Sequence, residues 1–474
     1  MTKKNKVKQM GDKIFFISLG CDKNLVDSEM MLGLLSEKGY EFTDDETEAD
    51  IVVINTCCFI NDAKQESIDT ILEMAELRKS GGLKALVVTG CLAQRYKEEI
   101  QKEIPEVDAI IGTTAIDEIT NVIETLLAKD CDSIDGKSPD AKSSGNVGEW
   151  DKYNSPDRTP LTDTKRIVTT GGHFAYLKIA EGCDKHCTYC IIPKVRGKYR
   201  SVPLESLVKE AMTLADGGVK ELILVAQETT IYGMDLYGKK MLSELLRRLC
   251  RIEGIQWIRL LYCYPEEIDD ELTSVIEAEP KICHYLDIPI QHGCDNILKR
   301  MGRRTNRREI EEIVGKLRRR IPDICIRTTL ITGFPGETEE EHQELLAFVE
   351  DMKFDRLGVF TYSQEEDTPA ADMPNQVAED VKEERQAQLM ELQQEIAFDA
   401  AKTMTGVCVD AMIEGKVADD DVYVARTYKD APNVDGLVFI NTQREFMTGD
   451  FVKVRITGAY EYDLIGELED ESAE

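Results

Sequence analysis

Three cysteines, Cys183, Cys187 and Cys190, stand at C-x3-C-x2-C spacing in the stretch EGCDKHCTYC, directly after an apolar run. Thiolates are soft ligands, and this spacing suits zinc or an iron–sulfur cluster. A structural zinc site needs four ligands, and His186 is the candidate fourth. However, His186 and Cys187 are adjacent and would rarely reach one tetrahedral centre together. Three thiolates on a 4Fe-4S cluster would instead leave one iron open for a chelating substrate.

A second set of three cysteines follows apolar runs near the N-terminus. Cys21 follows FFISLG, Cys57 follows VVINT and Cys91 follows LVVTG. If these runs are strands of one parallel sheet, the three side chains meet at its carboxyl edge, where such sheets bind ligands. Free cysteines are often simply buried, but three successive strand ends favour a shared metal site, again with an open iron. Cys58 should face away from Cys57, and we expect it to be structural.

The elements that must position these cysteines fall into domains. Short apolar runs alternate with helical patterns over residues 11–128, which predicts an open parallel-sheet α/β domain. Residues 129–166 are polar and rich in Ser, Asp, Gly and Pro, as in a mobile linker. Residues 167–400 hold six further strand–helix units, which predict an open partial barrel, and end in a charged helix. Short alternating strands over residues 401–470 predict a small antiparallel β-barrel.

Two glutamines and one arginine extend the candidate site of the partial barrel. Gln227 in LVAQETT and Gln291 in DIPIQHG follow the second and fourth strands, so both are expected at the carboxyl rim with the three-cysteine loop. Arg196 in KVRGKYRS can neutralise a ligand carboxylate or the charge of a cluster. Each has an ordinary alternative, because polar loop residues and solvated arginines are common.

The loop ITGFPGET follows the fifth strand of the same series. Gly333, Pro335 and Gly336 allow a close approach of backbone to a ligand, so they are candidate cofactor contacts. A plain strand-to-helix turn, in which Thr338 caps the next helix, explains the same residues equally well.

Composition restricts the partners. The chain has 58 basic and 90 acidic residues, and its net charge of -32 repels phosphate backbones unless a local basic patch overrides it. Residues 404–474 alone contain sixteen Asp and Glu against six Lys and Arg, which disfavours direct nucleic-acid binding and suits a basic protein. No apolar run approaches the roughly 20 residues of a membrane helix, so we expect a cytoplasmic protein with reduced thiols.

Together, two three-cysteine sites, a partial barrel and a terminal β-barrel resemble the methylthiotransferase family of radical SAM enzymes along nearly the whole chain. The stretches SLGCDKNLVDSE, PIQHGCDNILKRMGRRT, RTTLITGFPGE and GVFTYSQEEDTPAA are similar to the branch that modifies ribosomal protein S-twelve. The resemblance implies an auxiliary 4Fe-4S cluster on Cys21, Cys57 and Cys91. It also implies a second 4Fe-4S cluster in the barrel, which binds S-adenosyl-L-methionine, and a C-terminal TRAM domain that grips the substrate. The family often has Gly where this chain has Cys58 and Asp367, but no ligand is lost.

The resemblance also implies a reaction, in which a methylthio group is added to the beta carbon of an aspartate of ribosomal protein S-twelve. One S-adenosyl-L-methionine would methylate a sulfur associated with the auxiliary cluster, and a second would yield the radical that abstracts hydrogen. A low-potential electron donor, such as flavodoxin or ferredoxin, is then required. Two alternatives stay open: a tRNA adenosine methylthiotransferase with the same chemistry, and a non-enzymatic zinc-binding adaptor of the ribosome.

Overall fold

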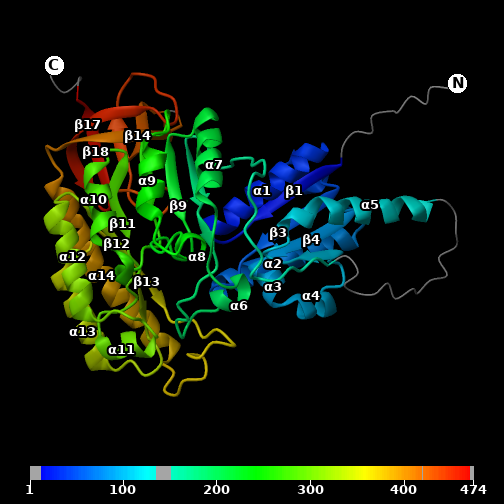
Figure 1. Cartoon of the computed structure of the whole chain (residues 1–474), viewed down its shortest axis with the longest axis horizontal. Coiled ribbons are helices and arrows are strands. Elements are labelled where there is room, and N and C mark those ends of the chain that lie inside the picture. Colours follow the sequence, from blue (N-terminus) through cyan, green and yellow to red (C-terminus); the bar gives the residue numbers. More distant parts are fainter. Residues whose placement is uncertain (1–11, 135–150, 419, 470–474) are drawn as a thin grey trace. The chain divides into compact units, whose positions relative to one another are not determined.

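The computed structural model describes residues 12–134, 151–418 and 420–469. The chain forms two compact units (Figure 1). Unit 1 comprises Met1–Val168 and Ile191–Lys198, and unit 2 comprises Thr169–Cys190 and Tyr199–Glu474. The chain therefore leaves unit 2 directly after Cys190, contributes eight residues to unit 1, and returns.

Unit 1 is built on a five-stranded parallel sheet in the order β2-β1-β3-β4-β5. Helices cover both faces, and β3 and β4 are buried throughout, as expected for a parallel sheet. The strand order reverses between β1 and β3, which makes the carboxyl edge there the place where such sheets bind ligands. The predicted open parallel-sheet domain is confirmed. The strands are β1 (Lys13–Ser18), β2 (Glu41–Thr43), β3 (Ile51–Thr56), β4 (Ala85–Gly90) and β5 (Ala109–Ile111).

The helices of unit 1 pack two apolar clusters against the two faces of this sheet. Ile191 and Val195 belong to one cluster, so the short excursion of the chain after Cys190 is part of the core of unit 1. The helices are α1 (Asp22–Lys38), α2 (Asn61–Lys79), α3 (Cys91–Arg95), α4 (Lys97–Glu103), α5 (Ile119–Ile134) and α6 (Ile192–Arg196), with 3-10 turns η1 (Glu46–Glu48) and η2 (Ile116–Glu118).

The segment predicted as a polar linker, residues 129–166, differs from that prediction over part of its length. Helix α5 continues to Ile134, and residues 135–150 lie outside the described residues. Beyond them, Arg158 pairs with Asp117 at 2.6 Å, and Arg166 Nε donates to Glu29 at 2.7 Å. The polar composition of this segment suggested a linker. Ion pairs with carboxylates that are distant in the sequence leave no local pattern, so the sequence did not show that part of the segment packs on unit 1.

Unit 2 contains a six-stranded parallel sheet in the order β13-β12-β11-β10-β9-β6, as predicted for an open partial barrel. The strands are β6 (Phe174–Lys178), β9 (Glu221–Val225), β10 (Trp257–Leu260), β11 (Ile282–Asp287), β12 (Cys325–Thr332) and β13 (Arg356–Thr361), and a two-stranded ribbon holds β7 (Ala180–Glu181) and β8 (Arg200–Ser201).

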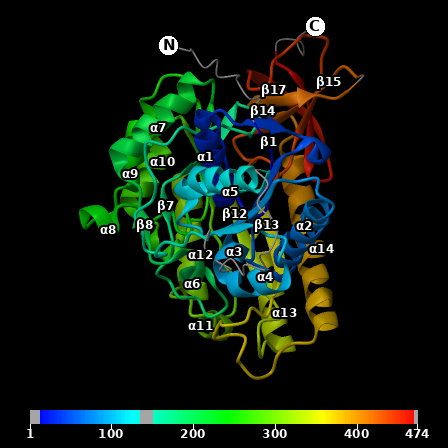
Figure 2. The same ribbon diagram turned by 90° about the vertical axis from the view of Figure 1, so that its right-hand side faces the viewer.

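Helices follow the strands of this sheet, and the long helix α14 packs against β13 (Figure 2). Residues 295–320 form two helices rather than one, because Gly302 takes a positive φ of 74° between them. The helices are α7 (Leu204–Asp216), α8 (Met234–Tyr237), α9 (Leu242–Cys250), α10 (Asp270–Ala278), α11 (Asp295–Arg300), α12 (Arg307–Arg320), α13 (Glu339–Met352) and α14 (Glu379–Thr403), with the 3-10 turn η3 (Pro265–Glu267).

The C-terminal part of unit 2 is a closed five-stranded barrel in the order β14-β15-β16-β18-β17. The predicted small barrel is confirmed, but its strands are not all antiparallel, because β16 and β18 run parallel. Directions cannot alternate around a ring with an odd number of strands, so one parallel pair is required. The strands are β14 (Cys408–Lys416), β15 (Val422–Thr427), β16 (Val438–Asn441), β17 (Phe451–Tyr460) and β18 (Asp463–Leu468).

Within unit 2, the closed barrel packs against the amino ends of the parallel strands. Glu221, the first residue of β9, accepts hydrogen bonds from Arg259 at 2.7 Å and from Arg426 of the closed barrel at 2.8 Å. Trp257, the first residue of β10, packs edge-on against Phe451 with ring centroids 4.8 Å apart. The closed barrel therefore lies at the opposite end of the strands from the three-cysteine loop.

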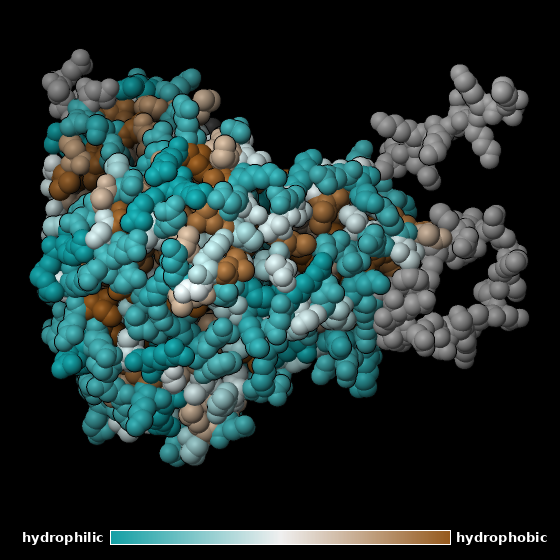
Figure 3. Space-filling view, viewed as in Figure 1, coloured by the Kyte–Doolittle hydropathy of each residue, from teal (hydrophilic) through white to brown (hydrophobic). Residues whose placement is uncertain are grey.

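In the part of the chain that the structure describes, no helix combines the length and apolar composition that a membrane span needs. The face of the molecule in Figure 3 is mostly hydrophilic, with hydrophobic residues scattered between hydrophilic ones.

Candidate functional site

The three predicted ligands of unit 1 lie directly beyond three neighbouring strands. Cys21 precedes α1 and follows β1, Cys57 follows β3, and Cys91 opens α3 after β4. Because β1, β3 and β4 are adjacent and parallel, their carboxyl ends share one edge of the sheet. Cys57 and Cys91 are buried and Cys21 is partly buried. Cys58, expected to be structural, is buried in the apolar core.

The loops that carry these cysteines are in close contact. Gly20 has a φ of 89°, and a Cβ atom there would lie 2.6 Å from Cβ of Cys57. Asn24 Nδ2 donates to the backbone oxygens of Leu19 at 3.1 Å and Thr56 at 2.9 Å. Asn24 thereby ties the loop after β1 to the loop after β3.

Arg196 contacts the third of these cysteines. Its Nε and Nη2 lie 3.4 Å and 3.3 Å from Sγ of Cys91, and its Nη1 donates to Oδ2 of Asp27 at 2.9 Å. Arg196 follows the C-x3-C-x2-C loop in the chain and was predicted to face a cofactor of the partial barrel. The structure instead places it in unit 1, where it can neutralise charge at Cys91. Its expected contact with S-adenosyl-L-methionine stays a prediction.

Burial controls the protonation of the buried thiols. It raises the pKa of Cys57 and, against the opposing charge of Arg196, the pKa of Cys91. In unit 2, burial raises the pKa of Cys183 to about 12. These thiols are therefore protonated near neutral pH, and binding of a metal would release their protons.

The C-x3-C-x2-C loop of unit 2 follows β6 and β7. Cys183 and Cys187 are buried, and Cys190 is partly buried. His186, the candidate fourth zinc ligand, is exposed and has a φ of 54°. Among the described residues, no three His, Cys, Asp or Glu side chains are placed to hold a single metal ion.

A lysine within this loop, with a side chain only 7% exposed, binds three carboxylates from other loops. Lys185 Nζ lies 3.1 Å from Glu228, 3.2 Å from Glu266 and 2.8 Å from Glu267. Glu228 follows β9, and the other two form η3 beyond β10. Burial raises the pKa of Glu228 to about 7, although the charge of Lys185 opposes this shift. The sequence carried no sign of this cluster, which fixes the cysteine loop to two strand ends.

Arg303 is a second buried cation near the loop. Its guanidinium stacks on Tyr264 with 4.4 Å to the ring centroid, and its Nη2 donates to the backbone oxygen of Pro289 at 2.8 Å. Its Nε and Nη1 are buried without a hydrogen-bond partner among the described residues. Like Lys185, Arg303 was not identified from the sequence, where it is one of several arginines in GRRTNRR.

The two predicted glutamines lie beyond β9 and β11, at the expected rim. Gln227 Nε2 donates to Glu181 at 2.9 Å, and its Oε1 is buried without a partner among the described residues. Gln291 has a φ of 75° and pairs with Leu330 of β12. Both remain candidate cofactor contacts.

The ITGFPGET loop has the geometry of a tight turn. Gly333 and Gly336 have φ values of 71° and 77°, and Pro335 between them is buried. Thr338 caps α13 in a capping box with Glu341. The capped turn is therefore present, and the contacts of Gly333, Pro335 and Gly336 with a cofactor stay predictions.

Family models match three parts of the chain. Residues 13–112 match the uncharacterized protein family UPF0004, residues 177–349 match the radical SAM superfamily, and residues 405–468 match the TRAM domain.

Full-length relatives decide the family. The ribosomal protein uS12 methylthiotransferase RimO of Lachnoclostridium phytofermentans is 62% identical over 457 residues, which are 96% of this chain and 100% of that protein. The chain belongs to the RimO family. RimO of Clostridioides difficile is 48% identical over 96% of this chain and 98% of that protein. The RimO family comprises radical SAM methylthiotransferases, so the predicted enzyme class, a transferase, is confirmed.

A solved structure supports the fold alone. The radical S-adenosylmethionine methyltransferase TsrM from Kitasatospora setae, with cobalamin and a [4Fe-4S] cluster bound, aligns with a TM-score of 0.52. The alignment covers 90% of this chain and 82% of that chain at 14% identity. Like the RimO family assignment, it agrees with a radical SAM barrel in unit 2.

Proposed function

We propose that this enzyme adds a methylthio group to the beta carbon of an aspartate in ribosomal protein uS12, using two S-adenosyl-L-methionines and two 4Fe-4S clusters. The observation that carries the proposal is the pair of three-cysteine sets, one at adjacent strand ends of unit 1 and one after β6 of unit 2. The names of the RimO relatives support uS12 as the substrate.

The donor sets fit such clusters. Each set offers three predicted thiolate ligands, which suits a cluster with one open iron better than a closed zinc site with four ligands. When bound, the clusters and S-adenosyl-L-methionine supply the sulfur and the radical that an unactivated carbon needs. Cys183, Cys187 and Cys190 would hold one cluster, and Cys21, Cys57 and Cys91 the other.

The chain's own residues would bind and orient these groups. Lys185 fixes the cysteine loop of unit 2 through three carboxylates. Gln227 has a buried oxygen without a partner among the described residues, and Arg303 has two such nitrogens, so both can bind polar groups of a ligand at the rim. Gly333, Pro335 and Gly336 would bring backbone close to it.

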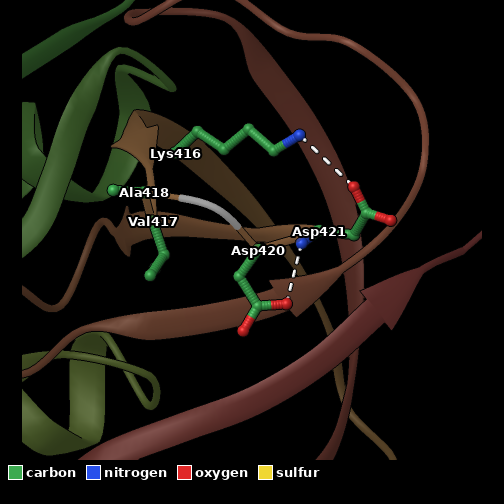
Figure 4. A pocket seen from close by; sticks show the side chains of 5 residues that line it. All are labelled: Lys416, Val417, Ala418, Asp420 and Asp421. Carbon is green, nitrogen blue, oxygen red and sulfur yellow. Dashed lines mark hydrogen bonds and ion pairs between the residues drawn. The ribbon is translucent and has the colours of Figure 1, made fainter.

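The closed barrel suits a basic macromolecular partner. A pocket on it is lined by Lys416, Val417, Ala418, Asp420 and Asp421 (Figure 4). Lys416 is 3.3 Å from Asp421, so these two charges offset each other. The carboxylate of Asp420 adds a second negative charge to the pocket. Because the barrel lies at the amino ends of the strands, a substrate that it holds must extend along them to the cysteine loop. Strands of five residues span roughly 16 Å, so a protein can make both contacts.

Mass spectrometry of uS12 from cells with and without this gene tests the proposal. We expect one methylthio addition on an aspartate, present only when the gene is present. A reaction in vitro identifies the substrate class. Purified enzyme is incubated with both uS12 and tRNA, with labelled S-adenosyl-L-methionine and with a low-potential electron donor such as flavodoxin or ferredoxin. Label in tRNA alone would establish the adenosine-modifying alternative. Zinc without iron in anaerobically purified protein would favour the alternative of a non-enzymatic zinc-binding adaptor of the ribosome.

A further inference from the structure

Arg196 is a buried cation that contacts both a carboxylate, Asp27, and a predicted cluster ligand, Cys91. It is 2% exposed, and two of its three nitrogens lie within 3.4 Å of Sγ of Cys91. The third donates to Asp27. All these residues belong to unit 1, because α6 is part of that unit.

The surroundings hold the guanidinium in this orientation. Arg196 Nη2 also donates to Oδ1 of Asn24, whose amide nitrogen donates to the backbone oxygens of Leu19 and Thr56. Asn24 therefore connects Arg196 to the loops that carry Cys21 and Cys57. Asp27 neutralises part of its charge through the hydrogen bond that Oδ2 accepts from Nη1.

We propose that Arg196 is a positioning residue of the auxiliary cluster, which donates two N–H groups to the thiolate of Cys91 and stabilises the reduced cluster. This inference rests on the proposed function, in which Cys91 is a ligand. Hydrogen bonds and positive charge at a ligating sulfur favour the form with more negative charge, so they raise the reduction potential. Asp27 acts in the opposite direction, because its charge partly cancels that of Arg196.

A simpler alternative is that Arg196 only anchors α6 to α1 through Asp27. The two roles make different predictions. If Arg196 is an anchor, removal of either partner breaks the same ion pair and changes the cluster in the same way. If Arg196 acts on Cys91, its removal and the removal of the Asp27 charge shift the reduction potential in opposite directions.

The test uses the full-length chain with Cys183, Cys187 and Cys190 replaced by Ala, so that all bound iron belongs to unit 1. This parent is reconstituted anaerobically with iron and sulfide, and redox titrations are followed by electron paramagnetic resonance. We expect Arg196→Gln to shift the reduction equilibrium at least about tenfold toward the oxidised form, equal to about 59 mV for one electron. Arg196→Lys keeps the charge and should shift it less, and Asp27→Asn should shift it the other way.

Arg158→Gln is the matched control, because Arg158 belongs to the same unit and donates its side-chain hydrogen bonds to Asp117 and to the backbone oxygen of Thr114. It should leave the reduction potential unchanged. A parent that binds no iron would contradict the auxiliary-cluster assignment itself. If the parent binds iron, two results would overturn the role of Arg196. One is a reduction potential in Arg196→Gln equal to that of the parent, and the other is a shift in Asp27→Asn in the same direction as the shift in Arg196→Gln. If Arg196→Gln fails to fold, the direction of the Asp27→Asn shift decides.

Discussion

Arg426 of the closed barrel and Glu221 at the start of β9 form a buried ion pair, with Nη2 and Oε2 2.8 Å apart and side chains 1% and 0% exposed. The other carboxylate oxygen of Glu221 accepts from Arg259 Nε at 2.7 Å. Burial opposes ionisation of Glu221, but the two guanidinium groups outweigh it and lower its pKa. One carboxylate thereby joins the closed barrel to the parallel sheet.

Replacing this carboxylate should destabilise unit 2 strongly. Glu221→Gln leaves Arg259 buried without its counter-charge and leaves Arg426 with Glu414 alone, so we expect the free energy of unfolding to fall by about 3–5 kcal/mol. Urea denaturation followed by circular dichroism measures the change. Asp410→Asn is the control, because its pair with Lys453 is exposed, and it should cause no resolvable change. Equal effects of the two variants would show that the buried pair does not join the two parts.

The stability of unit 2 should decrease at acidic pH for a defined reason. Burial opposes ionisation of Glu414, but the hydrogen bond from His173 and the charge of Arg426 lower its pKa below 4.5. A carboxyl with a lowered pKa stabilises the fold above its unfolded pKa, and this contribution is lost as the pH falls through the folded pKa. We expect the free energy of unfolding to fall below about pH 4.5, and less steeply in Glu414→Gln. The same slope in both proteins would contradict this.

Cysteine substitutions should separate the two predicted clusters. Cys187→Ala should abolish cleavage of S-adenosyl-L-methionine, because the loop of unit 2 loses a ligand. Cys57→Ala should preserve cleavage but stop methylthio transfer. From two four-iron clusters we expect about eight irons per chain, falling toward about four in each variant. Cys408→Ala, at an exposed cysteine, is the control. Methylthio transfer by Cys57→Ala would refute the auxiliary site.

Gly20 should be required for the same auxiliary site. In Gly20→Ala the new Cβ would lie 2.6 Å from Cβ of Cys57, so the loops after β1 and β3 must separate. We expect this variant to lose iron from unit 1 while cleavage of S-adenosyl-L-methionine persists. Gly39→Ala is the matched control, because Gly39 has a similar φ of 88° and nothing lies within 4 Å of the added atom. It should cost about 1–2 kcal/mol in backbone strain and keep its iron. Equal iron in both variants would contradict the close approach.

The sequence allowed the fold to be predicted because its elements carry local patterns. Apolar strands alternating with helices indicated both parallel sheets, and the charged helix predicted at the end of the partial barrel is α14. The topological rule for parallel strands also placed Cys21, Cys57 and Cys91 beyond adjacent strands. The two points of difference were part of the linker predicted over residues 129–166 and the single parallel pair, β16 with β18, in the closed barrel. Both features depend on which segments distant in the sequence pack together, and the local composition of the sequence does not indicate that.

By itself, the sequence determined the two three-cysteine sets, the sheets that carry them and the family resemblance, because spacing and periodicity are local properties of the chain. Only the tertiary structure decided which charges surround these cysteines. Arg196 and Cys91 are 105 residues apart, and Glu221 and Arg426 are 205 residues apart. A buried charge is stable only beside its partner, and that partner is supplied by packing between segments whose separation in the sequence leaves no pattern to read.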